Sequence, residues 1–313
     1  DGAYLECQDF WRISGIERSV YLYAQPKLRI RDFTVNAALD GAYQDGEFDL
    51  TVDIKNHLSK TQALRLSYSL FAGHNPVLKT ESKELTVRGH SECQAQFQAH
   101  VPDVQQWSAE HPRLYTLLLE TEDSQGKTLE AIARKIGFRT VEIKQGKLLV
   151  NGQRITLKGV NAQEHDPETG HVVSEALMMK DIRLWKENNI NAVRASHYPN
   201  QERWYELCNQ YGLYVVDEAN IEAHGMRFHA EKYGFIANDS SWAGQWLDRG
   251  RRMVERDKNQ PCIILWSMGN EAGDGTNFEK LYRWIKSRDG SRPVVYEPAG
   301  TKDHTDVVFP MYK

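Results

Sequence analysis

Hydrophobic residues alternate with polar ones through the first half of the chain. The alternation is strict over residues 48–54 and again over residues 64–70. A period of two is typical of strands that bury one face, and several such strands separated by polar turns are typical of a sandwich. The pattern predicts an immunoglobulin-like β-sandwich over residues 25–143. Residues 1–24 do not fit its strand count, and we predict that they end a preceding β domain.

The hydrophobic period changes near residue 144, where short apolar runs begin to alternate with amphipathic segments. Such runs are typical of parallel strands buried on both faces. We predict strands over 155–160, 191–196, 213–217, 262–267, 294–297 and 307–311, and helices around 178–185, 200–211, 242–257 and 277–286. The fold class is therefore multidomain, a β-sandwich followed by about six of the eight strands of a (β/α)8 TIM barrel over residues 144–313. Because a full barrel takes about 250 residues, we expect the chain to be a fragment.

Polar residues follow four consecutive predicted strands, at the end where barrel enzymes carry their catalytic groups. They are Asn161 to His165, His197, Glu218 to His224, and Asn270 with Glu271. Glu271 is the leading candidate for a catalytic acid, because the apolar run 261–266 leads almost directly to it. In the alternative interpretation, Glu271 complements a helix dipole, and His165 and His197 are ordinary hydrogen-bonded histidines.

Glu222 and His224 suggest a metal site. They lie two residues apart, so in an extended backbone both side chains emerge on the same side. Together with Glu271 they would offer two carboxylates and one imidazole to a single cation. Such a set suits Mg²⁺ or Mn²⁺ better than a metal that prefers thiolates. The alternative is a solvated Glu-x-His pair, which is common on protein surfaces.

Composition excludes several classes of partner. The chain has 39 basic and 43 acidic residues, a net charge of -4 and no basic tract, so we expect no nucleic-acid partner. No apolar stretch approaches the roughly 20 residues that span a bilayer, so we expect no membrane partner. The four cysteines are scattered without a CxxC motif, which favours reduced thiols and a cytoplasmic protein. A targeting signal upstream of Asp1 stays open as an alternative.

Three segments resemble the barrel signatures of the bacterial β-galactosidases of glycoside hydrolase family 2. They are residues 196–200, 216–226 and 266–273. The resemblance extends over nearly the whole chain: residues 5–15 resemble the close of the family's amino-terminal jelly-roll domain, residues 107–108, 112–115 and 137–139 resemble its sandwich domain, and residues 311–312 resemble its sixth barrel strand. The resemblance implies that residues 1–24 end a jelly-roll sugar-binding domain.

The resemblance implies a retaining hydrolase of terminal β-D-galactosides such as lactose. Glu271 matches the family's acid/base, and Asn270 matches the amide that contacts the sugar 2-hydroxyl. Glu222 and His224, with Glu271, match the ligands of Mg²⁺. Further matches are Asp9, which would contact substrate and Na⁺; His197, which would hold the galactose; Tyr312, near the nucleophile; and Arg194, an electrostatic support under the site. The resemblance also implies a homo-oligomer for the full-length protein.

Two departures from the family pattern affect these expectations. Residues 159–166 read GVNAQEHD where the family usually has GVNRHEHH, so Gln163 replaces a histidine that contacts the transition state. Glutamine can donate a hydrogen bond but cannot carry a positive charge, which leaves the substrate preference open. Moreover, neither Glu164 nor Glu297 matches the family's nucleophile, which follows the seventh barrel strand. We therefore expect the chain alone to be inactive.

Two alternative functions stay open. The chain could belong to a family 2 β-glucuronidase or β-mannosidase. It could also be a non-catalytic carbohydrate-binding module in which the partial barrel is a relic. Asn270–Glu271 and the Glu222-x-His224 pair argue against a relic, because a binding module needs no proton donor beside a metal.

Overall fold

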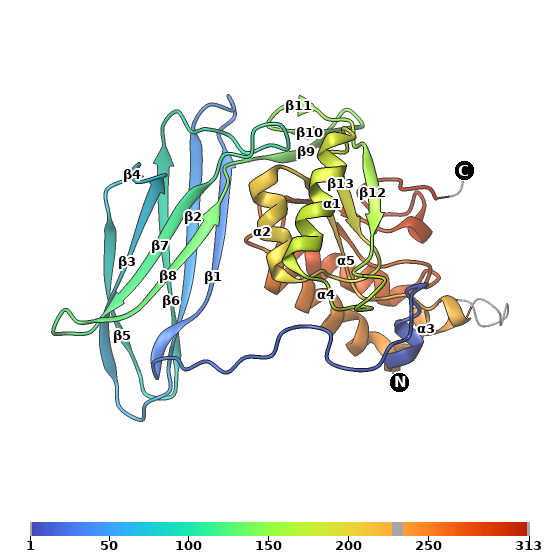
Figure 1. Ribbon diagram of the computed structural model, residues 1–313. Coiled ribbons are helices and arrows are strands. Elements are labelled where there is room, and N and C mark those ends of the chain that lie inside the picture. Colours follow the sequence, from blue (N-terminus) through green and yellow to red (C-terminus); the bar gives the residue numbers. More distant parts are fainter. Residues whose placement is uncertain (1, 227–233, 312–313) are drawn as a thin grey trace. The chain divides into compact units, whose positions relative to one another are not determined.

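The computed structural model describes residues 2–226 and 234–311. The described chain divides into two compact units, drawn in Figure 1. The sandwich unit comprises Val20–Trp107 and His111–Thr140. The barrel unit comprises Asp1–Ser19, Ser108–Glu110 and Val141–Lys313. Each unit is built around its own sheets.

Two antiparallel sheets form the sandwich unit, one with the order β1-β2-β6 and the other with the order β4-β3-β7-β8, to which β5 adds by pairing with β3. The strands are β1 (Leu28–Leu39), β2 (Gly46–Asn56), β3 (Gln62–Ala72), β4 (Asn75–Pro76), β5 (Glu81–Val87), β6 (Glu92–Val101), β7 (Tyr115–Glu122) and β8 (Thr128–Ile136). Alternate residues of β2 and β3, among them Val52, Ile54 and Leu66, are buried in a shared core. The predicted sandwich is therefore confirmed.

Parallel strands in sequence order form the main sheet of the barrel unit, with the order β12-β13-β14-β15-β16. A separate small sheet has the order β11-β10-β9. The elements of the barrel unit are β9 (Val141–Lys144), β10 (Lys147–Val150), β11 (Gln153–Arg154), β12 (Gly159–Ala162), α1 (Glu175–Glu187), β13 (Ala192–Ala195), α2 (Glu202–Tyr211), β14 (Tyr214–Glu218), α3 (Phe235–Asn238), α4 (Ala243–Asp257), β15 (Ile263–Ser267), α5 (Thr276–Arg288) and β16 (Val294–Val295), with 3₁₀ turns at Gly2–Leu5, His224–Met226, Ser240–Trp242 and Glu297–Ala299. The strand and helix order confirms a partial TIM barrel.

The first and last predicted strands of the barrel need correction. Residues 156–158 do not join the sheet; the side chain of Asn191 instead accepts a hydrogen bond from Lys158 N and donates one to Thr156 O. The predicted strand over 307–311 is reduced to a single bridge between Val307 and Val295. The described part of the sheet therefore has five strands instead of about six. Residues 307–311 pair with the sheet at one residue only, so they form no ladder of hydrogen bonds.

The described residues contain no helix long and apolar enough to cross a membrane. The four cysteines, Cys7, Cys93, Cys208 and Cys262, form no disulfide within the described residues.

Helix α2 ends at Gly212, which has a φ of 74° and donates its N–H to the carbonyl of Cys208. A Cβ at this position would lie 2.3 Å from the carbonyl oxygen of Ala109. Gly146 has a similar φ of 69°, but no atom lies within 4 Å of its added Cβ. Gly146→Ala should therefore cost only the left-handed penalty of about 1–2 kcal/mol.

We expect Gly212→Ala to lower the midpoint of thermal unfolding by clearly more than Gly146→Ala, because a backbone atom must also move. Circular dichroism of the two variants measures the difference. Equal losses would contradict the close approach of Gly212 to Ala109.

A pair of buried carboxyls, Asp217 on β14 and Asp257 at the end of α4, lies within the barrel unit. Tyr205 Oη donates to Asp217 Oδ1 at 2.5 Å, and Arg256 forms an ion pair with Asp257 at 2.7 Å. Burial raises the pKa of Asp217 well above its usual range, and the negative charge of Asp257 raises it further. The folded protein therefore keeps a proton on Asp217 over part of the pH range in which the unfolded chain has released it.

This proton makes the stability of the barrel unit fall as pH rises. A carboxyl whose pKa is higher in the folded protein than in the unfolded chain contributes its full stabilisation below the pKa of the unfolded chain. This stabilisation is lost as pH rises toward the pKa in the folded protein, by up to about 1.4 kcal/mol per pH unit. Asp217→Asn should remove this pH dependence, so the free energy of unfolding of the variant should rise relative to that of the wild type between pH 5 and pH 8. Urea unfolding at each pH tests this, with the exposed Asp248→Asn as control. Parallel pH profiles for wild type and Asp217→Asn would contradict the buried proton.

Candidate active site and metal cluster

Asn270 and Glu271 lie in a strained turn just after β15. Gly269 has a φ of 139°, and a Cβ there would lie 2.5 Å from the carbonyl oxygen of Ile221. Glu271 has a positive φ of 31°, a conformation that non-glycine residues seldom adopt. A parallel bridge between Glu222 and Asn270 joins this turn to the segment after β14. Backbone strain of this kind clusters at functional sites.

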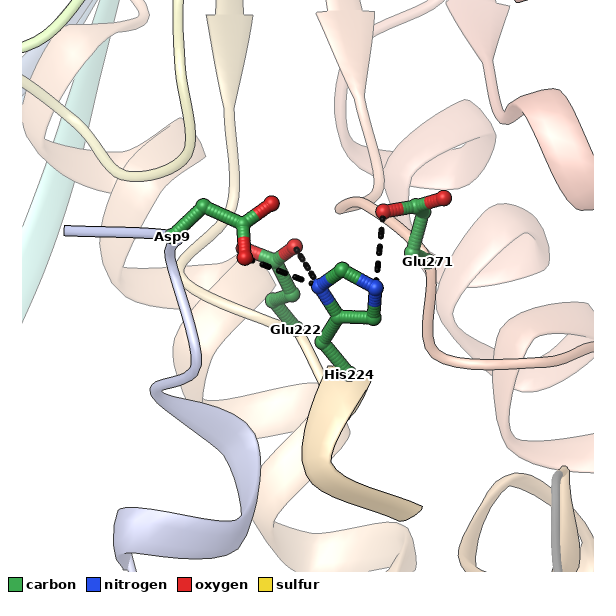
Figure 2. Close-up of side chains that lie close together, drawn as sticks. All are labelled: Asp9, Glu222, His224 and Glu271. Atoms are coloured by element: carbon green, nitrogen blue, oxygen red, sulfur yellow. Dashed lines mark hydrogen bonds and ion pairs between the residues drawn. The ribbon is translucent and has the colours of Figure 1, made fainter. Parts of the chain in front are cut away.

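Four side chains from distant parts of the chain converge beside this turn, as Figure 2 shows: Asp9, Glu222, His224 and Glu271. His224 Nδ1 lies 2.9 Å from Asp9 Oδ1 and 3.8 Å from Glu222 Oε1. On the other side of the ring, His224 Nε2 lies 3.5 Å from Glu271 Oε2. One ligand atom of each residue lies within 4.8 Å of the others. We call these four residues the acidic cluster.

Glu222 is the most deeply buried member of the acidic cluster. Burial raises its pKa to about 8, although the hydrogen bond from Asn270 lowers it, and the charges of Asp9, Glu218 and Glu271 raise it further. Asn270 Nδ2 donates to Glu222 Oε1 at 2.8 Å. The other oxygen, Oε2, is buried and has no hydrogen-bond partner among the described residues. An uncompensated carboxylate oxygen at this depth is costly.

The acidic cluster fits a divalent cation. Three carboxylates and one imidazole form an oxygen-rich donor set of the kind that suits Mg²⁺ or Mn²⁺. The unpartnered Oε2 of Glu222 is the oxygen that a cation would satisfy. The arrangement is one that could hold a metal, and Asp9 contributes to the same cluster as Glu222 and His224.

A second network fixes the groups beside the acidic cluster. Arg194 on β13 donates to Glu218 through Nε at 2.7 Å and through Nη2 at 2.9 Å. The same Nη2 donates to Asn270 Oδ1 at 2.9 Å. Bidentate arginine–carboxylate pairs hold both partners in a defined orientation. Arg194 therefore orients the Asn270 amide, which in turn contacts Glu222.

Glu218 is the residue whose role the sequence did not reveal. It is fully buried and also accepts from Ser267 Oγ at 2.6 Å and pairs with His197 Nδ1 at 2.7 Å. It thus orients both Arg194 and His197. Its position at the end of β14 was a signal, because parallel strand ends meet at one edge of a sheet, but nothing in the sequence specified its partners.

The remaining predicted residues line a cavity of about 680 Å³ at the strand ends. Gln163, Arg194, His197 and Asn270 all face it. Gln163 Nε2 also donates to the carbonyl oxygen of Gln8 at 2.9 Å, next to Asp9 in the chain. The structure thus brings the predicted residues together at one edge of the sheet, while Tyr312 lies outside the described residues.

A β-sandwich is followed by a partial β/α barrel whose strand ends carry clustered carboxylates. The family models agree: residues 28–139 match "Glycosyl hydrolases family 2", and residues 141–313 match "Glycosyl hydrolases family 2, TIM barrel domain". The chain belongs to glycosyl hydrolase family 2.

Curated relatives include the beta-galactosidases of Vibrio cholerae, 45% identical over 316 residues, and Photobacterium profundum, 44% identical over 318 residues. In both comparisons all of this chain is covered, together with 30% of the relative. The chain therefore spans about a third of the length of these relatives.

Solved structures share the fold at lower identity. A Bacteroides uniformis beta-glucuronidase aligns with a TM-score of 0.80 at 18% identity, over 92% of this chain and 36% of that protein. A putative beta-galactosidase from Bacteroides fragilis aligns with a TM-score of 0.75 at 16% identity, over 87% of this chain and 40% of that protein. At these identities the comparison shows the fold alone.

Proposed function

We propose that this chain forms part of the active site of a retaining β-galactosidase, which hydrolyses terminal β-D-galactosides such as lactose. The observation that carries the proposal is the placement of Glu271 and Asn270 beside the acidic cluster, in a chain 45% identical to a named beta-galactosidase. The substrate choice rests on that relative, and the chemistry rests on the site.

Glu271 is the acid/base in this proposal. In the first step its proton passes to the leaving glycosidic oxygen while the bond from that oxygen to the anomeric carbon breaks and a nucleophilic carboxylate bonds to the same carbon. In the second step the ionised Glu271 takes a proton from water, which displaces the nucleophile and releases the sugar. The Asn270 amide, oriented by Arg194, would contact the sugar 2-hydroxyl, and His197 and Gln163 would hold the ring in the neighbouring cavity.

Asp9, Glu222, His224 and Glu271 would hold a divalent cation such as Mg²⁺. When bound, the cation supplies positive charge beside Glu271, which favours the ionised form of that carboxyl. Asp9 is also the residue we propose for contact with Na⁺ and substrate. Its position next to His224 allows it to reach either ion.

The competing activities differ in what supports them. The structural similarity to a beta-glucuronidase is high, but at 18% identity it concerns the fold. A non-catalytic module would not require the paired Asn270–Glu271 and the unpartnered buried Glu222 oxygen. We also infer a cytoplasmic location from the free thiols and a homo-oligomeric state for the complete protein.

The test is hydrolysis by the protein from the complete reading frame that contains this chain. Aryl β-galactoside, β-glucuronide and β-mannoside are compared at equal concentrations. We expect turnover of the galactoside to exceed that of the others by at least tenfold. Turnover only of the glucuronide or mannoside would overturn the substrate, and turnover of none would favour a binding module.

The isolated chain should not turn over an aryl β-galactoside. Retaining hydrolysis needs a second carboxylate about 5–5.5 Å from the acid/base that acts as nucleophile, and no residue here matches the family's motif for it. Glu164, the buried alternative, is paired with Arg18 at 2.6 Å. Detectable hydrolysis by the purified chain, absent from its Glu271→Gln variant, would show that a carboxylate within the chain performs this role.

A further inference from the structure

Asp9 reaches the acidic cluster from a part of the chain that is far from the barrel strands in sequence. Figure 2 shows Asp9 on a separate segment, whereas Glu222, His224 and Glu271 follow β14 and β15. The carboxyl of Asp9 contacts His224 Nδ1 at 2.9 Å, but the side chain keeps 55% of its surface exposed. Packing does little to fix an exposed carboxyl, so its position depends on the backbone that carries it.

The backbone at Asp9 has an unusual conformation. Its φ is 50°, in the left-handed region that residues other than glycine seldom adopt. Conformations of this kind are costly and persist where the surrounding structure imposes them. Contacts to the peptide unit between Gln8 and Asp9 are therefore the ones that decide where the Asp9 carboxyl lies.

Both polar groups of that peptide unit are hydrogen-bonded. The carbonyl of Gln8 and the N–H of Asp9 lie in one plane, because the peptide bond is planar. Gln163 Nε2 donates to the Gln8 carbonyl oxygen at 2.9 Å, and the Asp9 N–H donates to the carbonyl oxygen of Cys7 at 2.7 Å. Together the two bonds fix the plane from which Asp9 projects.

The two bonds differ in what they attach this peptide unit to. The bond to Cys7 stays within the amino-terminal segment, and the Cys7 N–H in turn donates to the carbonyl oxygen of Glu222 at 3.2 Å. The bond from Gln163 comes from the residues that follow β12, a different strand of the sheet. Gln163 therefore ties the segment to the strand ends directly beside Asp9.

Gln163 can hold this bond and still serve the neighbouring cavity. A glutamine amide has two N–H donors and one acceptor oxygen. The bond to Gln8 uses one donor, and Gln163 also lines the cavity that contains Asn270 and His197. The second donor and the oxygen remain for a ligand in that cavity.

We propose that Gln163 is a positioning residue for the metal: it holds the peptide unit before Asp9 so that the Asp9 carboxyl completes the acidic cluster. The inference rests on the proposed function, in which that cluster holds a divalent cation. Groups that orient metal ligands typically contribute about 10–100-fold to metal affinity. Gln163→Met keeps the length of the side chain and removes its donors, so it should weaken Mn²⁺ binding by about that factor.

The test measures Mn²⁺ affinity by electron paramagnetic resonance of the free ion, with the metal-stripped complete enzyme and without any turnover. A double-mutant cycle with Asp9→Ala shows whether Gln163 acts through Asp9. Gln163→Met should weaken binding in the wild-type background and change it by less than twofold in the Asp9→Ala background. An equal loss in both backgrounds, or no loss in either, would overturn the proposal.

Gln201→Met is the matched control. Gln201 Nε2 also donates to a backbone carbonyl, that of Val173 at 3.1 Å, but Gln201 belongs neither to the acidic cluster nor to the lining of the cavity. It should change Mn²⁺ affinity by less than twofold. A loss as large as that of Gln163→Met would show a general effect of removing a glutamine and would overturn the specific role.

Absence of Mn²⁺ binding that depends on Asp9 and Glu222 would instead overturn the metal site of the proposed function. Hydrogen exchange of residues 6–10 then decides on Gln163, because the N–H groups of Cys7 and Asp9 are protected by the bonds that this segment makes. Exchange that is faster in Gln163→Met than in the wild type retains Gln163 as the residue that positions Asp9. Equal exchange removes it.

Discussion

Glu271→Gln is expected to lower kcat/KM of the complete enzyme for lactose by about 10²–10⁴-fold, the usual contribution of general acid/base catalysis. Glutamine keeps the size of the side chain and its place near His224 Nε2, but its amide is too weak an acid to transfer a proton to the leaving oxygen. The same substitution also removes the base that activates water in the second step. Steady-state kinetics measures the loss.

The loss should depend on the leaving group, and this distinguishes acid catalysis from misfolding. Dinitrophenolate leaves without protonation, so the first step with dinitrophenyl β-galactoside should fall much less than with lactose. Glu297→Gln is the control, since Glu297 lies in a 3₁₀ turn after β16 and outside the acidic cluster. Equal losses on both substrates would contradict the assignment of Glu271 as the acid.

Removal of divalent cations is expected to have the second largest effect. Chelation should lower galactosidase activity of the complete enzyme at least tenfold, and Mg²⁺ should restore it. The cation should also stabilise the isolated chain, because a ligand that binds only the folded state at 100 times its Kd adds about 2.7 kcal/mol to the free energy of unfolding. Thermal unfolding with and without Mg²⁺ measures this effect without any catalysis.

Glu222→Gln separates a specific site from general ion binding. The amide retains an oxygen that can accept from Asn270 but removes the charge that a cation would neutralise. The variant should lose most of the Mg²⁺-dependent rise in the unfolding midpoint. Glu206→Gln, at a partly exposed acid on α2 outside the acidic cluster, is the control. Equal stabilisation of wild type and Glu222→Gln would contradict the cluster as the metal site.

The local pattern of hydrophobic and polar residues predicted most of the fold, because this pattern reflects which residues are buried. The period-two residues of β2 and β3 are the core of the sandwich, and the apolar run that forms β15 is buried throughout. The pattern failed at residues 156–158, where the Asn191 side chain replaces sheet hydrogen bonds. A side chain that takes over backbone bonding leaves no trace in hydrophobic periodicity.

The contacts within the candidate site were harder to predict from short stretches of the sequence. Glu222, His224 and Glu271 could be predicted as neighbours because they follow adjacent strands, but Asp9 contacts His224 across 215 positions of the chain, and only the family resemblance indicated it. Glu218 stood among the strand-end polar residues, yet its hydrogen bonds to Arg194, His197 and Ser267 depend on three-dimensional packing. Spacing in the sequence indicates which residues can meet at a sheet edge, and it does not show which pairs form.

Azide rescue of a Glu271→Ala variant of the complete enzyme most directly tests Glu271 as the acid/base of a retaining β-galactosidase. With dinitrophenyl β-galactoside, the galactosyl intermediate should accumulate because no base activates water, and azide, which needs no base, should release it. We expect faster turnover with azide and β-galactosyl azide as the product. No acceleration, or an α-galactosyl azide, would contradict the assignment.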